Sequence, residues 1–235
     1  MPRKKKKNSR FKRLVRVLAL AAISIFLFTV FQVLALRFVN PPFTFGTTYD
    51  RVIQVLKGET WQKPAWHWTS LANISGHLKR AVLAAEDQRF LDHHGFDFIE
   101  LKIVLKDLFS TAKTRGASTI TMQTARTIFL LPSRSVIRKL LEAYYTVLIE
   151  LLWDKQRILE VYLNTVDWGK HILGAEAASR HYFNRPARTL NREQAARLAA
   201  ILPSPRRWSP VKPSEHVLWR QKRIMAAMDK MPALW

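Results

Sequence analysis

The 235-residue sequence contains no cysteine, which excludes disulfide bonds and metal sites built on thiolates. Acidic residues are scarce as well: 17 Asp and Glu stand against 39 Lys and Arg, for a formal net charge of +22. So basic a chain is expected to meet a polyanion, such as nucleic acid, anionic lipid headgroups or a phosphorylated substrate. Low-complexity tracts are absent, and a hydrophobic fraction of 48% excludes a wholly disordered chain.

The motifs of several enzyme classes are missing. The seven histidines form no His-Glu-x-x-His pattern, and the adjacent His93 and His94 cannot share one metal ion in ordinary geometry. No P-loop or dinucleotide-binding glycine pattern occurs. Because there is also no convincing alternating strand run and no internal repeat, the sequence predicts a mainly α fold.

Positive charge is concentrated at the N-terminus. Residues 1–16 hold nine basic side chains and no acidic one, and residues 17–36 carry no charge at all. Those twenty residues, at about 1.5 Å each, span the roughly 30 Å hydrocarbon core of a bilayer. We predict a basic cytoplasmic tail over 1–16 and one transmembrane anchor over 17–36, rather than a cleaved signal peptide or a buried core helix. The rest of the chain then lies outside the cytoplasm, where nucleic acid is not an expected partner.

The remainder divides into a predicted connector, 37–72, and one compact helical domain, 73–235. Asn40-Pro41-Pro42 ends any preceding helix. Tryptophans at 61, 66 and 68 either lie at the headgroup level or cap the globular core. Residues that can begin helices in the domain are Ser75, Ser118, Asp154, Asn191 and Ser214.

Glu86 is the first candidate for acid–base chemistry. It lies at the edge of an apolar stripe formed by Leu78, Ala81 and Val82, near the end of the helix that Ser75 begins. Burial at such a place raises the pKa of a carboxyl group towards the range useful for catalysis. The alternative is a surface glutamate paired with Arg89, three residues further on.

Glu142 is the second candidate, inside a helix predicted over residues 136–152. Arg138 and Lys139 lie four and three residues before it on the same face. The three residues form either an ion pair on the helix surface or a cluster placed for function. The apolar neighbours Leu140, Leu141 and Val147 suggest that Glu142 is buried, which favours the functional cluster. Two cations against one carboxylate leave positive charge available for a phosphate.

Residues 116–123 place small side chains and three hydroxyl groups at a helix start. Free backbone N–H groups and the positive end of the helix dipole suit an anionic oxygen cluster there, and Arg115 and Arg126 add charge. Serine and threonine at a helix start are also ordinary caps.

These segments belong to a series of ordered motifs. The first comprises Glu86, Asp87, Phe90, His93, Gly95 and Asp97. The second comprises Gly116, Ser118, Thr119, Ile120, Thr121 and Gln123. The third comprises Arg138, Lys139 and Glu142, and the fourth Lys155, Ile158, Leu159, Glu160, Tyr162, Leu163 and Asn164. A fifth region covers the small-residue run 174–183 and the stretch 198–205.

In this order the motifs resemble those of glycosyltransferase family 51, the peptidoglycan glycosyltransferases, and specifically its monofunctional, membrane-anchored biosynthetic members. The resemblance implies a lysozyme-like helical lobe and a small membrane-facing jaw lobe, here the 96–109 block. It implies lipid II and the growing glycan strand as substrates, with inverting β-1,4 transfer and release of undecaprenyl pyrophosphate. It also implies an inner-membrane location, with division or elongation proteins as further partners.

The resemblance assigns roles residue by residue. Glu86 would be the general base, and Glu142 would orient the neighbouring cations or hold a divalent ion such as Mg or Mn. The substrate-binding residues it implies are Asp87, Phe90, His93, Ser118, Thr119, Gln123, Arg126, Arg138 and Lys139. Met122, Arg126, Thr127 and Gln194 depart from the usual family residues, Gln194 from a common glutamate, but none of these departures removes a carboxylate needed for the reaction. A lysozyme-like lytic enzyme and a catalytically weak scaffold of a cell-wall complex remain as alternatives.

Overall fold

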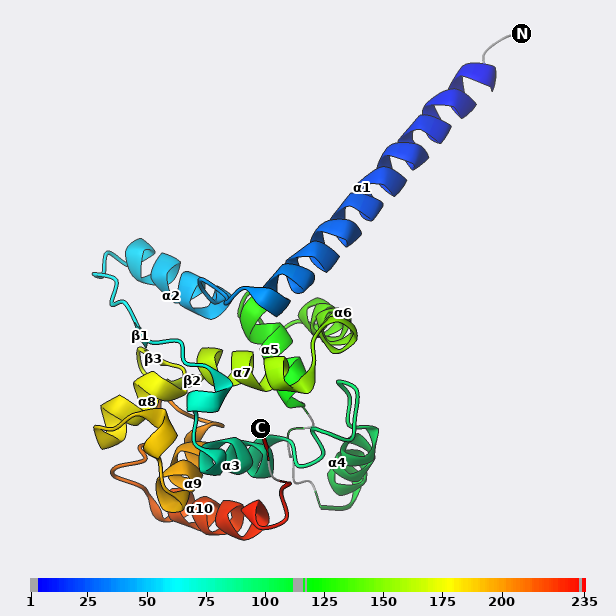
Figure 1. Cartoon of the computed structure of the whole chain (residues 1–235). Coiled ribbons are helices and arrows are strands. Elements are labelled where there is room, and N and C mark those ends of the chain that lie inside the picture. The colour runs from blue at the N-terminus through cyan, green and yellow to red at the C-terminus, as the bar shows by residue number, and fades with distance from the viewer. Residues whose placement is uncertain (1–3, 112–115, 117, 233) are drawn as a thin grey trace. The chain divides into compact units, whose positions relative to one another are not determined.

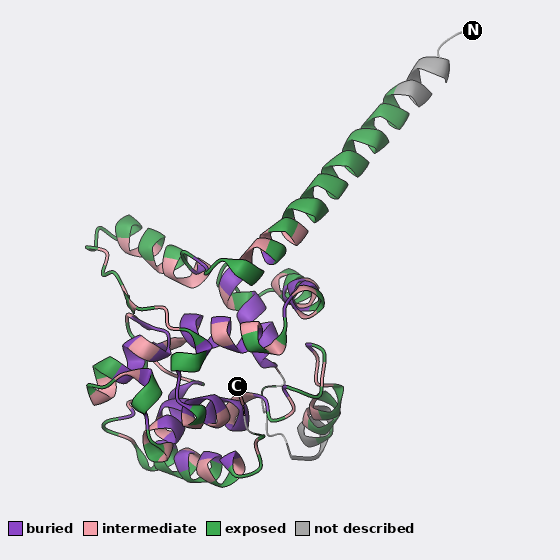
Figure 2. Ribbon diagram, viewed as in Figure 1, coloured by how far each residue is buried: buried purple, intermediate pink, exposed green. Residues whose placement is uncertain are grey.

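The computed structural model describes residues 4–111, 116, 118–232 and 234–235, and the chain divides into two compact units. The first unit, residues 1–40, holds helix α1 (Lys4–Phe38). Within α1, residues Arg10–Phe38 are long and apolar enough to cross a membrane, and most of their side chains are exposed (Figure 2). The helix fits a single-pass membrane anchor, while the exact limits of tail, anchor and connector stay predictions.

The second unit, residues 41–235, is mainly helical, which confirms the predicted fold class (Figure 1). Its helices are α2 (Phe45–Leu56), α3 (Gly76–Glu86), α4 (Phe98–Thr111), α5 (Ile120–Phe129), α6 (Val136–Leu152), α7 (Lys155–Thr165), α8 (Ala175–Phe183), α9 (Arg192–Ile201) and α10 (Glu215–Met228). Short 3-10 turns occur at η1 (Leu71–Asn73) and η2 (Ala187–Thr189).

Two groups of packed helices form the core. Helices α3, α9 and α10 contact one another, and α5 contacts both α6 and α7 (Figure 1). Leu78, Ala81 and Val82 are buried in α3, as their spacing predicted. The functional residues described below come from helices of both groups.

Four of the five predicted helix-capping residues are confirmed. The side chains of Ser75, Asp154, Asn191 and Ser214 each accept a backbone N–H in the first turn of their helices. Ser118 was the wrong choice for α5: the adjacent Thr119 caps this helix and accepts the Met122 N–H at 3.2 Å. Thr119 also donates its hydroxyl to the carbonyl oxygen of Gly95 at 2.6 Å, which fixes its side chain in the capping position.

A small three-stranded sheet accompanies the helices, although the sequence shows no convincing alternating strand run. Strand β1 (Ala65–Trp66) pairs in parallel with β3 (Ile172–Leu173), and β3 pairs antiparallel with β2 (Asp167–Gly169). Strands of two or three residues are too short to show an alternating pattern, so the sequence carries no signal for them.

Asn164 of helix α7 forms hydrogen bonds with the segment that follows β1. Its side chain accepts the Thr69 N–H and donates to the Thr69 carbonyl, both at 2.9 Å. Its own carbonyl accepts the indole N–H of Trp66 at 2.7 Å. Trp66 is therefore held against the helical domain. For this tryptophan, the contact supports the alternative that it covers the globular core rather than lying at the level of the lipid headgroups.

Helix α6 exposes the apolar side chains that were expected to be buried. Leu140, Leu141 and Val147 are exposed, while Glu142, between them in sequence, is completely buried. The opposite face of α6 packs against α5, so only that face is protected from the surroundings. Helix α4 likewise exposes Phe98 and Ile99.

Candidate active site

A cleft of about 680 Å³ lies where the end of α3, the start of α5 and helix α10 meet. It contains Glu86 and several residues of the second motif. The lining side chains that bear on its chemistry are Glu86, Asp87, Ser118, Thr119, Gln123, Arg126 and Arg220. We refer to it as the first cleft.

Glu86 is the last residue of α3 and is half-buried at the wall of this cleft. One carboxylate oxygen accepts the side-chain N–H of Gln123 at 3.0 Å. Arg89 pairs instead with Asp97 at 2.8 Å, so the surface-pair alternative for Glu86 is wrong. Burial raises the pKa of Glu86, while the Gln123 hydrogen bond and the positive charges of Arg220 and Arg126 partly oppose that rise. The result is a carboxylate with an enhanced tendency to take up a proton.

Tyr162 holds the Gln123 amide in this orientation. The Tyr162 hydroxyl donates to Gln123 Oε1 at 3.3 Å, which leaves the amide N–H groups to face Glu86. Tyr162 is buried, and this burial raises its pKa well above the ordinary value, so the phenol stays a neutral donor. The Tyr162–Gln123–Glu86 chain links α7 through α5 to the end of α3.

Of the first-motif residues Asp87, Phe90 and His93, Asp87 alone is among those that line the first cleft. Asp87 Oδ1 contacts His93 Nε2 at 2.8 Å, and Asp87 Oδ2 accepts the Ile120 N–H at 3.0 Å, so Asp87 ties the end of α3 to the start of α5. Phe90 is completely buried, with the Lys155 ammonium 4.6 Å from its ring centre. This placement favours a positioning role for Phe90 and His93, whose predicted contact with substrate stays untested.

Gly95 lies where the first motif approaches α6. Its φ of +87° is a backbone conformation that residues with a side chain rarely adopt. A Cβ atom there would lie 2.7 Å from Thr146 Cγ2 and 3.0 Å from Glu150 Cγ, both on α6. Glycine is therefore required for conformation and for space.

A basic cluster, which we define as Arg138, Lys139 and Glu142, lies beside the first cleft. Both cations reach the buried Glu142 carboxylate at 2.5 Å, one to each oxygen. Lys139 Nζ also lies 3.5 Å from Ser118 Oγ, a residue of the cleft wall. Within the described part of the chain, Arg138 Nε is a buried donor without a partner. The cluster keeps one unneutralised positive charge next to the start of α5.

Neither Glu142 in the basic cluster nor the group Asp87, His93 and Asp97 offers the predicted divalent ion a suitable set of free ligand atoms. Both Glu142 oxygens are already occupied by cations, which disfavours a metal at the basic cluster. Ligand atoms of Asp87, His93 and Asp97 lie within 4.8 Å of one another. The Asp87 oxygens, however, already contact His93 and the Ile120 N–H, and Arg89 spans both Asp97 oxygens at 2.8 and 2.9 Å.

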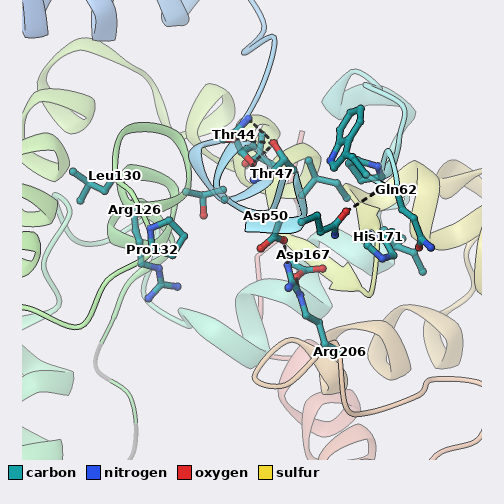
Figure 3. A pocket seen from close by; sticks show the side chains of 18 residues that line it. Thr44, Thr47, Asp50, Gln62, Arg126, Leu130, Pro132, Asp167, His171 and Arg206 are labelled. Atoms are coloured by element: carbon teal, nitrogen blue, oxygen red, sulfur yellow. Dashed lines mark hydrogen bonds and ion pairs between the residues drawn. The ribbon is translucent and has the colours of Figure 1, made fainter. Parts of the chain in front are cut away.

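Arg126 also lines a second cleft of about 310 Å³, nearer the C-terminal end of α5 (Figure 3). Thr47, Asp50 and Gln54 of α2 form one wall of this second cleft. Arg206 spans its edge, reaching Asp50 at 2.8 Å and Asp167 at 2.6 Å. A cation at position 126 can therefore act on ligands in either cleft.

Sequence reasoning missed Arg220 and gave Tyr162 no role in the site. Arg220 comes from α10, far from any motif, and only the tertiary packing of α10 on α3 and α9 brings it to the first cleft. Arg115, which was expected to add charge before α5, lies outside the described residues.

Comparison with known proteins gives consistent matches. The family described as Transglycosylase matches residues 51–229. A biosynthetic peptidoglycan transglycosylase of Bacteroides thetaiotaomicron is 43% identical over 223 residues, covering 94% of this chain and 89% of the relative. A protein of the same description from Chromohalobacter salexigens is 51% identical over 164 residues, 70% of each chain. Another, from Ectopseudomonas mendocina, is 46% identical over 199 residues, covering 85% of this chain and 82% of the relative.

Proposed function

The chain belongs to the transglycosylase family, and from this premise we propose that it polymerises lipid II with Glu86 as the general base. It is a peptidoglycan glycosyltransferase of cell-wall biosynthesis, with the lysozyme-like helical domain expected from the sequence. Lipid II carries a disaccharide-pentapeptide on undecaprenyl pyrophosphate. Each coupling therefore joins two sugars and releases the lipid pyrophosphate.

In the proposed reaction, Glu86 takes the proton from the 4-hydroxyl of the acceptor N-acetylglucosamine. The hydroxyl oxygen attacks the anomeric carbon of the donor N-acetylmuramic acid while the bond from that carbon to the pyrophosphate oxygen breaks. Attack opposite the leaving group inverts the configuration and gives a β-1,4 link. The observation that carries this assignment is the half-buried Glu86 carboxylate, whose pKa is raised by burial and which Gln123 orients into the first cleft.

The leaving group requires neutralisation of charge more than it requires a proton. Arg126, Arg138 and Lys139 can stabilise the pyrophosphate as its negative charge develops, because preorganised cations act strongly on such charge. Glu142 would hold Arg138 and Lys139 in place rather than bind a metal. Ser118, Thr119 and Gln123, at the start of α5, lie in the wall that the substrate would face.

The proposed location is the inner membrane, with α1 as a single-pass anchor. The nine basic residues among the first sixteen favour a cytoplasmic N-terminus, so residues 41–235 would face the periplasm. Lipid II, the growing strand and the membrane are the proposed partners, and division or elongation proteins stay predicted ones.

Substitution of Glu86 by glutamine tests the assignment directly. Glu86→Gln retains the shape of the side chain but removes the base, so polymerisation of labelled lipid II should fall by a factor of order 10² or more. Glu193→Gln, on the exposed first turn of α9, is the matched control and should polymerise normally. Near wild-type turnover of Glu86→Gln would refute the assignment. Cleavage of finished glycan without lipid II coupling by the unmodified protein would favour the lytic alternative.

A further inference from the structure

Helix α2 has its polar and apolar faces reversed relative to a helix packed on a water-soluble protein. Its polar residues Thr47 and Asp50 point into the second cleft (Figure 3), and Gln54 also lines this cleft. Its apolar residues point outward: Tyr49 is 39% exposed, Val52 49% and Leu56 77%. A helix at the edge of a domain normally turns its apolar stripe towards the core. This arrangement indicates that the surroundings of α2 are not bulk water.

The outward residues form one continuous stripe. Tyr49, Val52, Val55 and Leu56 follow the spacing i, i+3, i+6 and i+7, so they lie along one side of the helix. A Thr44–Thr47 capping box fixes the start of α2, and the Lys57 and Gly58 N–H groups close its end. The stripe therefore lies on a helix with defined ends.

The covalent chain identifies what covers this stripe. Helix α1 ends at Phe38 and α2 begins at Phe45, seven positions later. Seven extended residues reach at most about 25 Å, so α2 begins within that distance of the point where the membrane-crossing helix ends. A lipid surface is thus necessarily close to α2.

The charges that border the stripe match a lipid surface as well. Arg51 and Lys57 are exposed next to the apolar residues, where their guanidinium and ammonium groups can reach lipid phosphates. The Arg51 guanidinium lies 4.9 Å from the ring centre of Trp61, and tryptophan is enriched at the level of lipid headgroups.

From these observations we infer that α2 is a second membrane contact: it lies in the plane of the bilayer surface, with the stripe Tyr49–Leu56 in the lipid. The lipid would meet the outer face of α2 while its inner face forms a wall of the second cleft. This contact would hold the second cleft, and Arg126 within it, at the depth of the lipid headgroups. The inference adds a lipid-binding surface to the proposed function and does not depend on which residue is the catalytic base.

The absence of cysteine allows a clean test by spin labelling. A nitroxide spin label is attached to the cysteine of the full-length Val52→Cys variant. The labelled protein is then reconstituted in vesicles of phosphatidylethanolamine and phosphatidylglycerol. Val211→Cys is the matched control, because Val211 is also a valine with 49% exposure but lies between α9 and α10. Accessibility of each label to oxygen, which concentrates in lipid, is compared with accessibility to a water-soluble nickel chelate.

The inference requires the Val52 label to be more accessible to oxygen than to nickel, and the Val211 label to show the opposite order. Leu56→Cys should repeat the Val52 result, so that one poorly folding variant does not decide the outcome. A Val52 label as accessible to nickel as the Val211 label would overturn the inference. A label shielded from both reagents would overturn it too, because it would place a protein surface over α2. Lipid II turnover of the labelled variants, measured separately, tests the proposed function.

Discussion

Replacing Gly95 with alanine tests how closely the first motif must approach α6. The new methyl group would meet Thr146 Cγ2 at 2.7 Å and Glu150 Cγ at 3.0 Å. Overpacking of this kind costs about 1–3 kcal/mol. The φ of +87° adds about 1–2 kcal/mol for a residue with a side chain. The free energy of unfolding should therefore fall by about 2–5 kcal/mol.

Gly58 provides a control that separates these two costs. Its φ is also positive, +70°, but a Cβ atom at this position would have nothing within 4 Å. Gly58→Ala should therefore cost only the conformational part, about 1–2 kcal/mol. Loss of glycine freedom in the unfolded chain affects both variants alike and cancels in the comparison.

Thermal unfolding in detergent, followed by circular dichroism, measures the difference. At roughly 2–4 °C per kcal/mol for a domain of this size, Tm should fall by roughly 10 °C in Gly95→Ala and by roughly 4 °C in Gly58→Ala. Adding Thr146→Ser to Gly95→Ala removes the clashing methyl group but keeps the hydroxyl that donates to the Glu142 carbonyl, so Tm should partly recover. Equal losses for both glycine variants, or no recovery in the double variant, would refute the packing argument.

Two further predictions concern the charged groups. Glu142→Gln should lower the free energy of unfolding by about 3 kcal/mol, measured by thermal unfolding, because it leaves Arg138 without its buried counter-charge; an unchanged Tm would contradict this. Gln123→Ala removes a hydrogen bond that lowers the pKa of Glu86, so that pKa should rise further. A smaller fraction of the base is then deprotonated at any given pH, and the acid limb of the kcat/KM profile should move to higher pH; a shift to lower pH would be the contrary result.

The parts of the fold that the sequence predicted are those with local signals. Asp154 and Asn191 begin helices because their side chains satisfy N–H groups only a few residues away. The helix predicted over residues 136–152 from its long apolar run coincides with α6, whose start the Ser135 side chain caps. Glu86 was also recognised locally, from its position at the end of the buried stripe of α3.

The parts that it did not predict depend on distant residues or on the solvent. Arg220 reaches the cleft of Glu86 through the packing of α10, which no spacing along the chain encodes. Leu140 and Leu141 were expected to be buried, because apolar patterning does not show which apolar side chains are covered by another helix and which stay exposed. Helix α2 lies within the predicted connector and was not recognised. Its apolar residues point outward and its polar residues inward, so its pattern does not indicate packing on the domain.

The bonds between Asn164 and Thr69 have a consequence for biosynthesis of the chain. The two residues are 95 positions apart, so Thr69 leaves the ribosome long before its partner exists. At about 5–20 residues per second, the interval is on the order of 5–20 s. During that time α1 is already available to the membrane while β1 still lacks the β3 edge with which it pairs. Pairing of β1 in the sheet is therefore possible only after the second half of the domain has been synthesised.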